Sequence, residues 1–331
     1  MSILVCGGAG YIGSHTVLTL KRSGYDVVVC DSLVTGHEKA LPKEVKLYKG
    51  DIKDSCLMDK IFTENSIDAV VDFAAFSIVG ESVLNPHKYF ENNVYGTLCL
   101  LNSMVKHNVL KMVFSSTAAT YGEPENIPIS ENDKTIPENP YGESKLMVEK
   151  ILKWFDAAYG FKYIALRYFN AAGADVSGEI GEDHSPETHL IPIVLMAALG
   201  IREEISVFGT DYPTKDGSCV RDYIHVLDLA KAHVLALESL IKSGGSNVYN
   251  LGNGKGFSVL EVIETARKVT GKKIISKEAK RRTGDPSVLI ASSEKITKEL
   301  GFKAEYASLE KIIETAWLWH SSHPQGYNDK K

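Results

Sequence analysis

The chain has 331 residues, with 37 Lys and Arg against 42 Asp and Glu, a net charge of -5 and 44% hydrophobic residues. A chain of this length forms one large or two ordinary domains whose core needs no disulfide or metal to hold it. The near balance of charge excludes the basic surface that binds nucleic acids or anionic membranes nonspecifically. A phosphate-containing ligand must therefore be bound by a few local residues.

The sequence favours a cytoplasmic protein without a membrane span. The longest apolar stretch, 189–201, has about 13 residues and contains Pro192, whereas a helix needs about 20 residues to cross a bilayer. Residues 1–6 run directly into an apolar segment without a basic region or cleavage site, so we expect a first strand there. The five cysteines are odd in number and widely spaced, which is typical of a reducing compartment.

Short β-branched runs alternate with amphipathic helical stretches from residue 1 to about residue 170. The pattern predicts strands at 3–6, 27–30, 46–48, 69–73, 112–114 and 163–167, with helices at 12–22, 57–64 and 93–106. Strands that are apolar on both faces and separated by helices form a parallel sheet covered on both sides. We therefore assign residues 1–170 to a Rossmann-type, doubly wound α/β domain.

The regularity ends after Asn170, where segments rich in Gly, Asp and Pro separate helices predicted near 190–199 and 227–240. We assign residues 171–331 mainly to a smaller, mixed α/β domain that binds the substrate. One further strand, near 247–252, is expected to return to the first sheet. Ser258 and Glu261 fit a capping box before a helix that continues to Val269.

A glycine-rich loop lies between the first predicted strand and the first helix. Gly7, Gly10 and Gly13 permit a tight turn, so the amides that begin the helix can face a pyrophosphate. Asp31 ends the second strand, 18 residues after Gly13, where a carboxylate binds the 2′-hydroxyl of an adenosine ribose. This pattern predicts NAD rather than NADP. Asp51, which follows the third strand with Ile52, is placed to reach the adenine.

Tyr141 and Lys145 are four residues apart on one predicted helix face. A nearby ammonium lowers the pKa of a phenol, so we expect Tyr141 to accept a hydroxyl proton near neutral pH. The run 112–117 ends in Ser115, Ser116 and Thr117 at the edge of the sheet where the cofactor is expected. These features predict proton-transfer chemistry beside a dinucleotide, although the hydroxyls also suit a turn or a helix cap.

The glycine loop, Asp31, Asn92, the hydroxyls at 115–117 and the Tyr141–Lys145 pair, in this order, resemble the extended short-chain dehydrogenase/reductase family. Downstream segments narrow the resemblance to the UDP-glucose 4-epimerase family over nearly the whole chain. They are RYFN from residue 167, DYPT from 211, RDYIH from 221, YNLG from 249, RRTGD from 281 and HPQG from 323.

The resemblance implies an isomerase of galactose metabolism that interconverts UDP-glucose and UDP-galactose through a transient 4-keto sugar, with tightly bound NAD. Tyr141 would be the base and acid at the sugar 4-hydroxyl, and Thr117 would bond to the same oxygen. Lys145 would be the electrostatic partner of Tyr141 and would bind the nicotinamide ribose. A homodimer is also implied, and N-acetylated UDP-sugars remain an open question.

Two sets of binding residues follow from the resemblance. Those for NAD are Gly7, Gly10, Tyr11, Ile12, Gly13, Asp31, Ser32, Leu33, Thr35, Gly36, Asp51, Ile52, Phe73, Ala74, Ala75, Ser77, Asn92, Lys145 and Phe169. Those for the UDP-sugar are Thr117, Tyr141, Asn170, His189, Leu190, Val207, Phe208, Arg221, Arg282, Asp285 and Leu289. The two arginines supply charge-assisted bonds to the diphosphate, which is consistent with a chain that has no broad basic surface.

Five positions depart from the pattern of the family. Cys6 replaces a Thr before the glycine loop, and Thr117 stands where Ser is frequent, so a hydroxyl is kept there. Ser77 replaces a Lys that contacts the cofactor in some members, and His189 replaces an Asn on the uracil side. Leu289 stands where some members have a Tyr, and this smaller side chain leaves room for an N-acetyl group on the sugar.

Three other functions are less consistent with these motifs. Dehydratases and decarboxylases of the superfamily carry acidic residues after the strand-end hydroxyl, whereas this chain has Ala118 and Ala119. A dehydrogenase that releases NADH is disfavoured by the nucleotide-sugar signature of the second half. An NAD-sensing protein without activity would not need Tyr141, Lys145 and Thr117 together.

No metal site is predicted, because the ten histidines are scattered and His320 and His323 are expected to be solvated in a polar tail. Leu98, Leu101 and Val105 suit either the core or a dimer interface.

Overall fold

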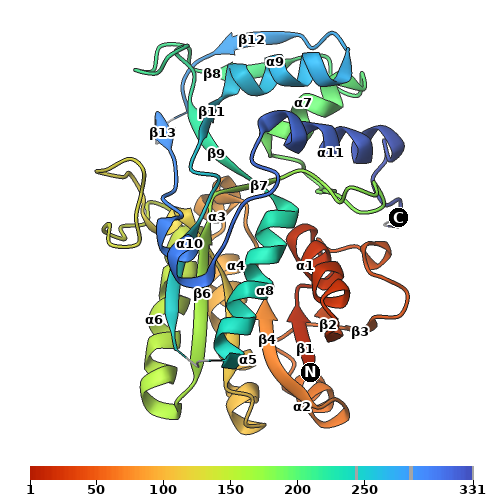
Figure 1. Cartoon of the computed structure of the whole chain (residues 1–331), viewed down its shortest axis with the longest axis vertical. Coiled ribbons are helices and arrows are strands. Elements are labelled where there is room, and N and C mark those ends of the chain that lie inside the picture. The colour runs from red at the N-terminus through yellow and green to blue at the C-terminus, as the bar shows by residue number, and fades with distance from the viewer. Residues whose placement is uncertain (243–244, 283–285, 330–331) are drawn as a thin grey trace.

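The computed structural model describes residues 1–242, 245–282 and 286–329. Its centre is a parallel sheet of seven strands in the order β10-β6-β5-β4-β1-β2-β3 (Figure 1). The strands are β1 (Ser2–Cys6), β2 (Asp26–Asp31), β3 (Lys46–Lys49), β4 (Ile67–Asp72), β5 (Lys111–Thr117), β6 (Lys162–Tyr168) and β10 (Asn247–Leu251). The Rossmann-type α/β fold predicted from the sequence is confirmed.

Helices cover both faces of this sheet. Successive residues of a strand point to opposite faces, so neighbouring residues are buried in different clusters. In β1, Ile3 and Val5 join one apolar cluster, whereas Leu4 and Cys6 join another. The first cluster is covered by α1 (Tyr11–Arg22), α8 (Val226–Lys242) and α10 (Glu294–Leu300). The second is covered by α2 (Ser55–Glu64), α5 (Thr97–Lys106) and α6 (Pro140–Tyr159).

Strand β10 forms one edge of the central sheet although it lies late in the chain. It pairs in parallel with β6, with Asn247 opposite Ile164 and Leu251 opposite Tyr168. Helix α8 lies against α1 on the same sheet face (Figure 1). The first layer therefore draws on residues well beyond Asn170, and the domain boundary at that residue stays a prediction.

A second layer lies above the sheet in Figure 1 and has its own apolar core. Its strands are β7 (Asn170–Ala172), β8 (Ile205–Phe208), β9 (Val220–His225), β11 (Gly256–Ser258), β12 (Ser276–Ala279) and β13 (Val288–Leu289). Its helices are α7 (Leu190–Ala198), α9 (Val259–Thr270) and α11 (Leu309–Ser322). The expected capping box is present at the start of α9, where the Ser258 hydroxyl accepts a bond from the Glu261 amide at 3.0 Å.

The end of the described chain differs from the polar, solvated tail that was expected. His320 lies within α11 and is partly buried. The ring of His323 stacks on buried Trp319, with the ring centres 3.9 Å apart. The difference arises because one face of α11 is apolar along its length and is buried. Leu309, Ile312 and Ala316 pack into the second core, and Trp319 packs into a smaller cluster. Within the described residues, no helix combines the length and apolar character that a membrane crossing requires.

Candidate active site

The glycine loop connects β1 to α1 and is closely packed against the turn that follows β4. Gly7 has a φ of +70°, and a Cβ there would lie 2.7 Å from the amide nitrogen of Ala74. A Cβ at Gly13 would lie 2.2 Å from the Gly7 carbonyl oxygen, so α1 starts directly on the loop. Gly10 is different, because its nearest neighbour would be that same oxygen at 3.4 Å. A side chain at Gly10 would project in front of the first turn of α1, where a dinucleotide phosphate needs space.

Asp31 holds the two loops that are expected to contact the adenosine. Its carboxylate accepts bonds from the amides of Ala9, at 2.8 Å, and Leu33, at 2.7 Å. A Cβ on Gly36 would lie 2.9 Å from Asp31 Oδ1, so this loop is packed closely around the carboxylate. The geometry fits NAD, since an acidic side chain lies at the end of β2 beside the glycine loop.

The other residues predicted to bind NAD lie mainly at the carboxyl ends of the parallel strands. Asp51 and Ile52 follow β3, and Ile52 is buried, whereas the Asp51 carboxylate accepts a bond from the Lys53 amide at 2.9 Å. Phe73 follows β4, and its amide donates to the Cys6 carbonyl at 2.8 Å. Gly13 is buried, whereas the rest of the set is exposed or partly buried. These residues are Tyr11, Ile12, Ser32, Thr35, Ala74, Ala75, Ser77, Asn92 and Phe169.

Asn93 positions the cofactor side of the site and was missed by the sequence analysis. It lies in a π-helical stretch, η2 (Phe90–Gly96), that precedes α5. Its side chain accepts from the Phe76 amide and donates to the Phe76 carbonyl, both at 3.0 Å. Its amide nitrogen also bonds to the Ser144 hydroxyl at 3.1 Å, and Ser144 donates to the Tyr141 carbonyl. Asn93 therefore ties the turn after β4 to the helix that carries Tyr141.

Tyr141 is placed by the start of α6. The Asn139 side chain caps this helix by accepting from the Gly142 amide at 2.9 Å, and Pro140 occupies the first helical position. Thr117, the last residue of β5, lies close enough to the Tyr141 phenol for its side chain to lower the pKa of that phenol. The structure thus brings the predicted base and the predicted hydroxyl partner together at the edge of the sheet.

Lys145, four residues after Tyr141 on α6, is buried and donates a bond to the Ser115 carbonyl oxygen at 2.7 Å. Burial lowers the pKa of Lys145 to about 8, against the opposing attraction of the Asp72 and Glu149 carboxylates. The pKa of Tyr141 is raised, because burial outweighs its hydrogen bond with Thr117. The predicted lowering of the Tyr141 pKa is therefore wrong for the protein without its cofactor. The Lys145 ammonium is instead bonded to Ser115 on β5.

The three neighbouring hydroxyls at the end of β5 have different partners. The Ser115 hydroxyl is 2.5 Å from the Tyr168 phenol oxygen. Ser116 points to the other face, where it donates to Glu149 at 2.5 Å, within a buried ion pair between Glu149 and Arg167. The Thr117 side chain influences the pKa of the Tyr141 phenol, and its hydroxyl also accepts a bond from the Ala119 amide at 3.2 Å.

A cavity of about 290 Å³ lies in the second layer, next to the strand that follows Tyr168. The predicted substrate residues that line it are Asn170, His189, Leu190, Phe208, Arg221 and Arg282. Arg202 also lines the cavity and was missed, because its exposed loop carries no motif. Val207 is buried and is not among the lining residues, and Asp285 lies outside the described residues.

The two arginines that line this cavity are positioned in different ways, Arg221 by strand pairing and Arg282 by contact with an aromatic ring. Arg221 lies on β9, where its Cα is paired in parallel with that of Leu289 on β13. Leu289 itself does not line the described cavity. The Arg282 guanidinium lies over the Phe208 ring at 4.0 Å from its centre. Such stacking orients a guanidinium while leaving its edge to bond an anion.

Comparison with known proteins gives consistent matches along the chain. A model of the protein family described as the NAD dependent epimerase/dehydratase family matches residues 3–252. A UDP-glucose 4-epimerase from Halalkalibacterium halodurans is 62% identical over 328 residues, covering 99% of this chain and 98% of the relative. A crystal structure of a UDP-glucose 4-epimerase has a TM-score of 0.98 and 52% identity, over 99% of this chain and 100% of that chain.

A fourth similar protein has been solved as a complex with ligands. The crystal structure of UDP-glucose 4-epimerase from Bifidobacterium longum in complex with NAD+ and UDP has a TM-score of 0.93 and 44% identity. The match covers 99% of this chain and 100% of that chain.

Proposed function

This chain belongs to the NAD-dependent epimerase/dehydratase family and, within it, to the UDP-glucose 4-epimerases, and we propose how its residues carry out the reaction. The enzyme is an isomerase that uses NAD to invert C4 of UDP-sugars, interconverting UDP-glucose and UDP-galactose, as the sequence predicted. The residue roles described below rest on the geometry of the site.

We propose that Tyr141 removes the proton of the sugar 4-hydroxyl and later returns it. The phenol lies near the Thr117 side chain, which in this proposal bonds to the same sugar oxygen. Because burial raises the Tyr141 pKa, a positive charge beside the phenol is needed to favour the phenolate. The buried Lys145 ammonium and the positive charge of the oxidised nicotinamide would act in that direction.

Bound NAD supplies the acceptor and donor of the hydride. Loss of hydride from C4 gives a 4-keto sugar, and its return to the opposite face of the ring inverts the centre. Inversion therefore requires a sugar that can turn within the site while the nucleotide stays fixed. We propose that Arg221, Arg282 and the stacked Phe208 hold the UDP, because these residues line one cavity.

The observation that carries this assignment is the position of Thr117 and Tyr141 between the two binding regions. Thr117 pairs with Tyr168 across β5 and β6, and Asn170, two residues further on, lines the cavity. On the other side, Asn93 connects the Tyr141 helix to the turn after β4. The sugar end of a UDP-sugar in the cavity would therefore face both Tyr141 and the cofactor edge.

A direct test uses the protein purified without added NAD. We expect it to retain NAD and to convert UDP-galactose to UDP-glucose without further cofactor. Release of NADH in proportion to the sugar consumed would contradict the epimerase and support a net dehydrogenase. The same preparation, given UDP-N-acetylglucosamine, measures whether N-acetylated sugars are substrates.

We also propose a homodimer formed through α6 and the stretch before α5. Trp154 and Met147 are seven residues apart on α6, and their side chains are 74% and 37% exposed. Tyr95, which precedes α5, is 55% exposed. Leu101, by contrast, is fully buried in the core. Light scattering should give twice the mass of the chain, and Trp154→Glu should weaken the dimer. Ile201→Glu, at an exposed residue of the second layer, should leave it intact.

The cytoplasmic location remains our proposal. All five cysteines, which lie within the described residues, are free, and Cys6, Cys30 and Cys219 are buried. Unpaired thiols in a protein core are consistent with a reducing compartment.

A further inference from the structure

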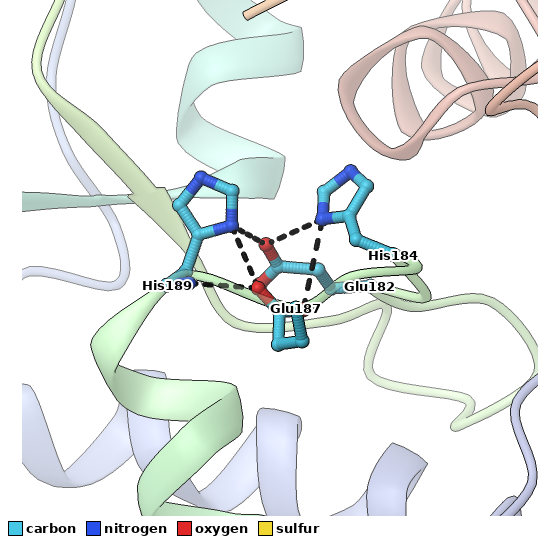
Figure 2. Close-up of side chains that lie close together, drawn as sticks. All are labelled: Glu182, His184, Glu187 and His189. Carbon is cyan, nitrogen blue, oxygen red and sulfur yellow. Dashed lines mark hydrogen bonds and ion pairs between the residues drawn. The ribbon is translucent and has the colours of Figure 1, made fainter. Parts of the chain in front are cut away.

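Four side chains converge in a loop beside the UDP cavity, and the proposed proton and hydride transfers do not involve them. The loop runs from residue 181 to the start of α7, and Figure 2 shows its side chains pointing toward one another. We call them the loop cluster, and they are Glu182, His184, Glu187 and His189. One possible ligand atom from each lies within 4.8 Å of all the others.

The distances within the loop cluster are short enough for the four side chains to share one ion. His189 Nδ1 is 2.9 Å from Glu182 Oε1 and 2.9 Å from Glu187 Oε1. His184 Nδ1 is 3.2 Å from Glu182 Oε1 and 3.7 Å from Glu187 Oε2. Ligands placed about 2.0–2.1 Å from a tetrahedral zinc ion are separated by roughly 3.3 Å, so small movements would complete such a site.

A second observation points to an occupant. The Glu182 side chain is only 4% exposed, and its Oε1 atom is buried without a hydrogen bond among the described contacts. His184 Nδ1 is likewise buried without one, although both atoms point into the cluster. Proximity alone leaves these groups unsatisfied, because a ring N–H donates along one direction only. A buried polar atom without a directed hydrogen bond is costly, and a bound cation would coordinate both Glu182 Oε1 and His184 Nδ1.

The donor set identifies the class of cation. Two imidazole nitrogens and two carboxylates favour a transition metal over magnesium or calcium, which prefer oxygen ligands alone. We propose that the loop cluster binds one divalent metal ion of the zinc class. The four ligands come from eight consecutive residues, so the ion would fix the path of the loop.

The position of the loop cluster gives the ion a structural role. His189 is the residue that precedes α7 and also lines the UDP cavity. The His184 ring packs edge-on to the ring of Tyr11, the first residue of α1, at 6.2 Å between centres. An ion here would hold the wall of the UDP cavity against the helix that begins at the glycine loop, without taking part in the reaction.

The test measures zinc binding to the full-length enzyme after dialysis against a chelator. We expect about one zinc per chain, bound in competition with a chromophoric chelator. The His184→Gln and Glu182→Gln substitutions should each weaken binding at least about tenfold. The matched control is His87→Gln, which removes an exposed histidine that also pairs with a glutamate, Glu91. Equal zinc binding by wild type and the two cluster variants would overturn the proposal.

A second readout does not depend on the variants folding normally. In wild type, Co²⁺ in place of zinc should give the visible absorption of a four-coordinate site, and zinc should raise the Tm by several degrees over the chelated protein. His189→Gln, at the exposed end of the cluster, should reduce both signals. Wild-type protein that shows neither the absorption nor the shift in Tm would also overturn the proposal.

Discussion

The ammonium of Lys145 is bonded to the carbonyl oxygen of Ser115, 2.7 Å away, and is attracted by the buried carboxylate of Asp72. Asp72 ends β4, next to β5, and burial raises its own pKa to about 6. The two groups are thus oppositely charged near neutral pH in a nearly solvent-free part of the site. Each stabilises the charged form of the other, which limits how easily Lys145 loses its proton.

We predict that Asp72→Asn moves the alkaline limit of activity to lower pH. The Asp72 carboxylate raises the Lys145 pKa from the value that burial alone would give, so removing this charge lowers that pKa. The measurement is the pH dependence of kcat/KM in both proteins. Asp68→Asn, at an exposed residue of the same strand, is the control. An alkaline limit that does not move would separate Lys145 protonation from turnover.

Tyr141→Phe should abolish turnover while leaving NAD bound. The substitution removes the phenol oxygen that would accept the proton, and general base catalysis is worth about 10²- to 10⁴-fold. Activity and NAD content are measured on the same preparation. Tyr159→Phe, at the exposed end of the same helix, should retain both. Near-normal activity of the Tyr141 variant would remove this residue from the mechanism.

Two glycines of the cofactor loop should respond differently to Ala. Gly13→Ala places a Cβ 2.2 Å from the Gly7 carbonyl oxygen, so we expect a loss of stability of about 1–3 kcal/mol or more. Gly10→Ala meets only that oxygen at 3.4 Å, so its stability should change little while NAD occupancy falls. Urea unfolding and cofactor content distinguish the two effects.

The control for this pair is Gly80→Ala, where a Cβ would meet nothing within 4 Å. Full NAD content in Gly10→Ala would show that the space in front of α1 is not needed for the cofactor.

Asp222→Asn should change how stability depends on pH. The buried Asp222 carboxylate accepts bonds from the amides of Asn253, Gly254 and Ala291, yet burial raises its pKa to about 6. In the folded state it therefore holds a proton between about pH 4 and pH 6 that the unfolded chain has lost. Its contribution to stability is present below about pH 4 and falls by about 3 kcal/mol as the pH rises through 6.

The asparagine variant lacks this titration, so its stability deficit relative to wild type should shrink between pH 4 and pH 7. Urea unfolding at several pH values measures it, with Asp26→Asn at an exposed position as the control. A deficit that is constant with pH would contradict the assignment to Asp222.

Leu289→Tyr should depress the turnover of N-acetylated UDP-sugars more than that of UDP-glucose. Leu289 is paired with Arg221 across β13 and β9, so a larger side chain there would extend toward the region that Arg221 lines. The measurement is kcat/KM for both substrates, with Leu289→Ile as a control for the loss of leucine. Equal losses on both sugars would argue against a role in sugar selection.

The parts of the molecule that were predictable have local signals in the sequence. The sequence of β1 does not show alternating apolar and polar residues, because Ile3 and Leu4 are both apolar and face different clusters. A strand that is apolar on both faces indicates a parallel sheet covered on both sides. The glycine loop was predictable because its three glycines and the following helix are contiguous. The start of helix α9 was also local, since Ser258 and Glu261 cap each other.

The parts that were not predictable depend on contacts between distant segments. Lys145 has the correct spacing to Tyr141, but the carbonyl that fixes its ammonium comes from Ser115 on another element. Ser116 and Thr117 are equivalent hydroxyl residues in the sequence, but in the structure the Ser116 hydroxyl donates to Glu149. The loop cluster was missed because the proximity of Glu182 and His189 depends on the path of an irregular loop.

The return of β10 to the edge of the cofactor sheet affects how the protein is made. Synthesis from the N-terminus produces Tyr141, Lys145 and six of the seven strands long before Asn247–Leu251 emerges. Until then β6 has a free edge, with backbone groups open to pairing with another chain. The growing chain therefore carries nearly all of its catalytic residues during a period when it is most exposed to misassembly, and completion of the edge ends that period.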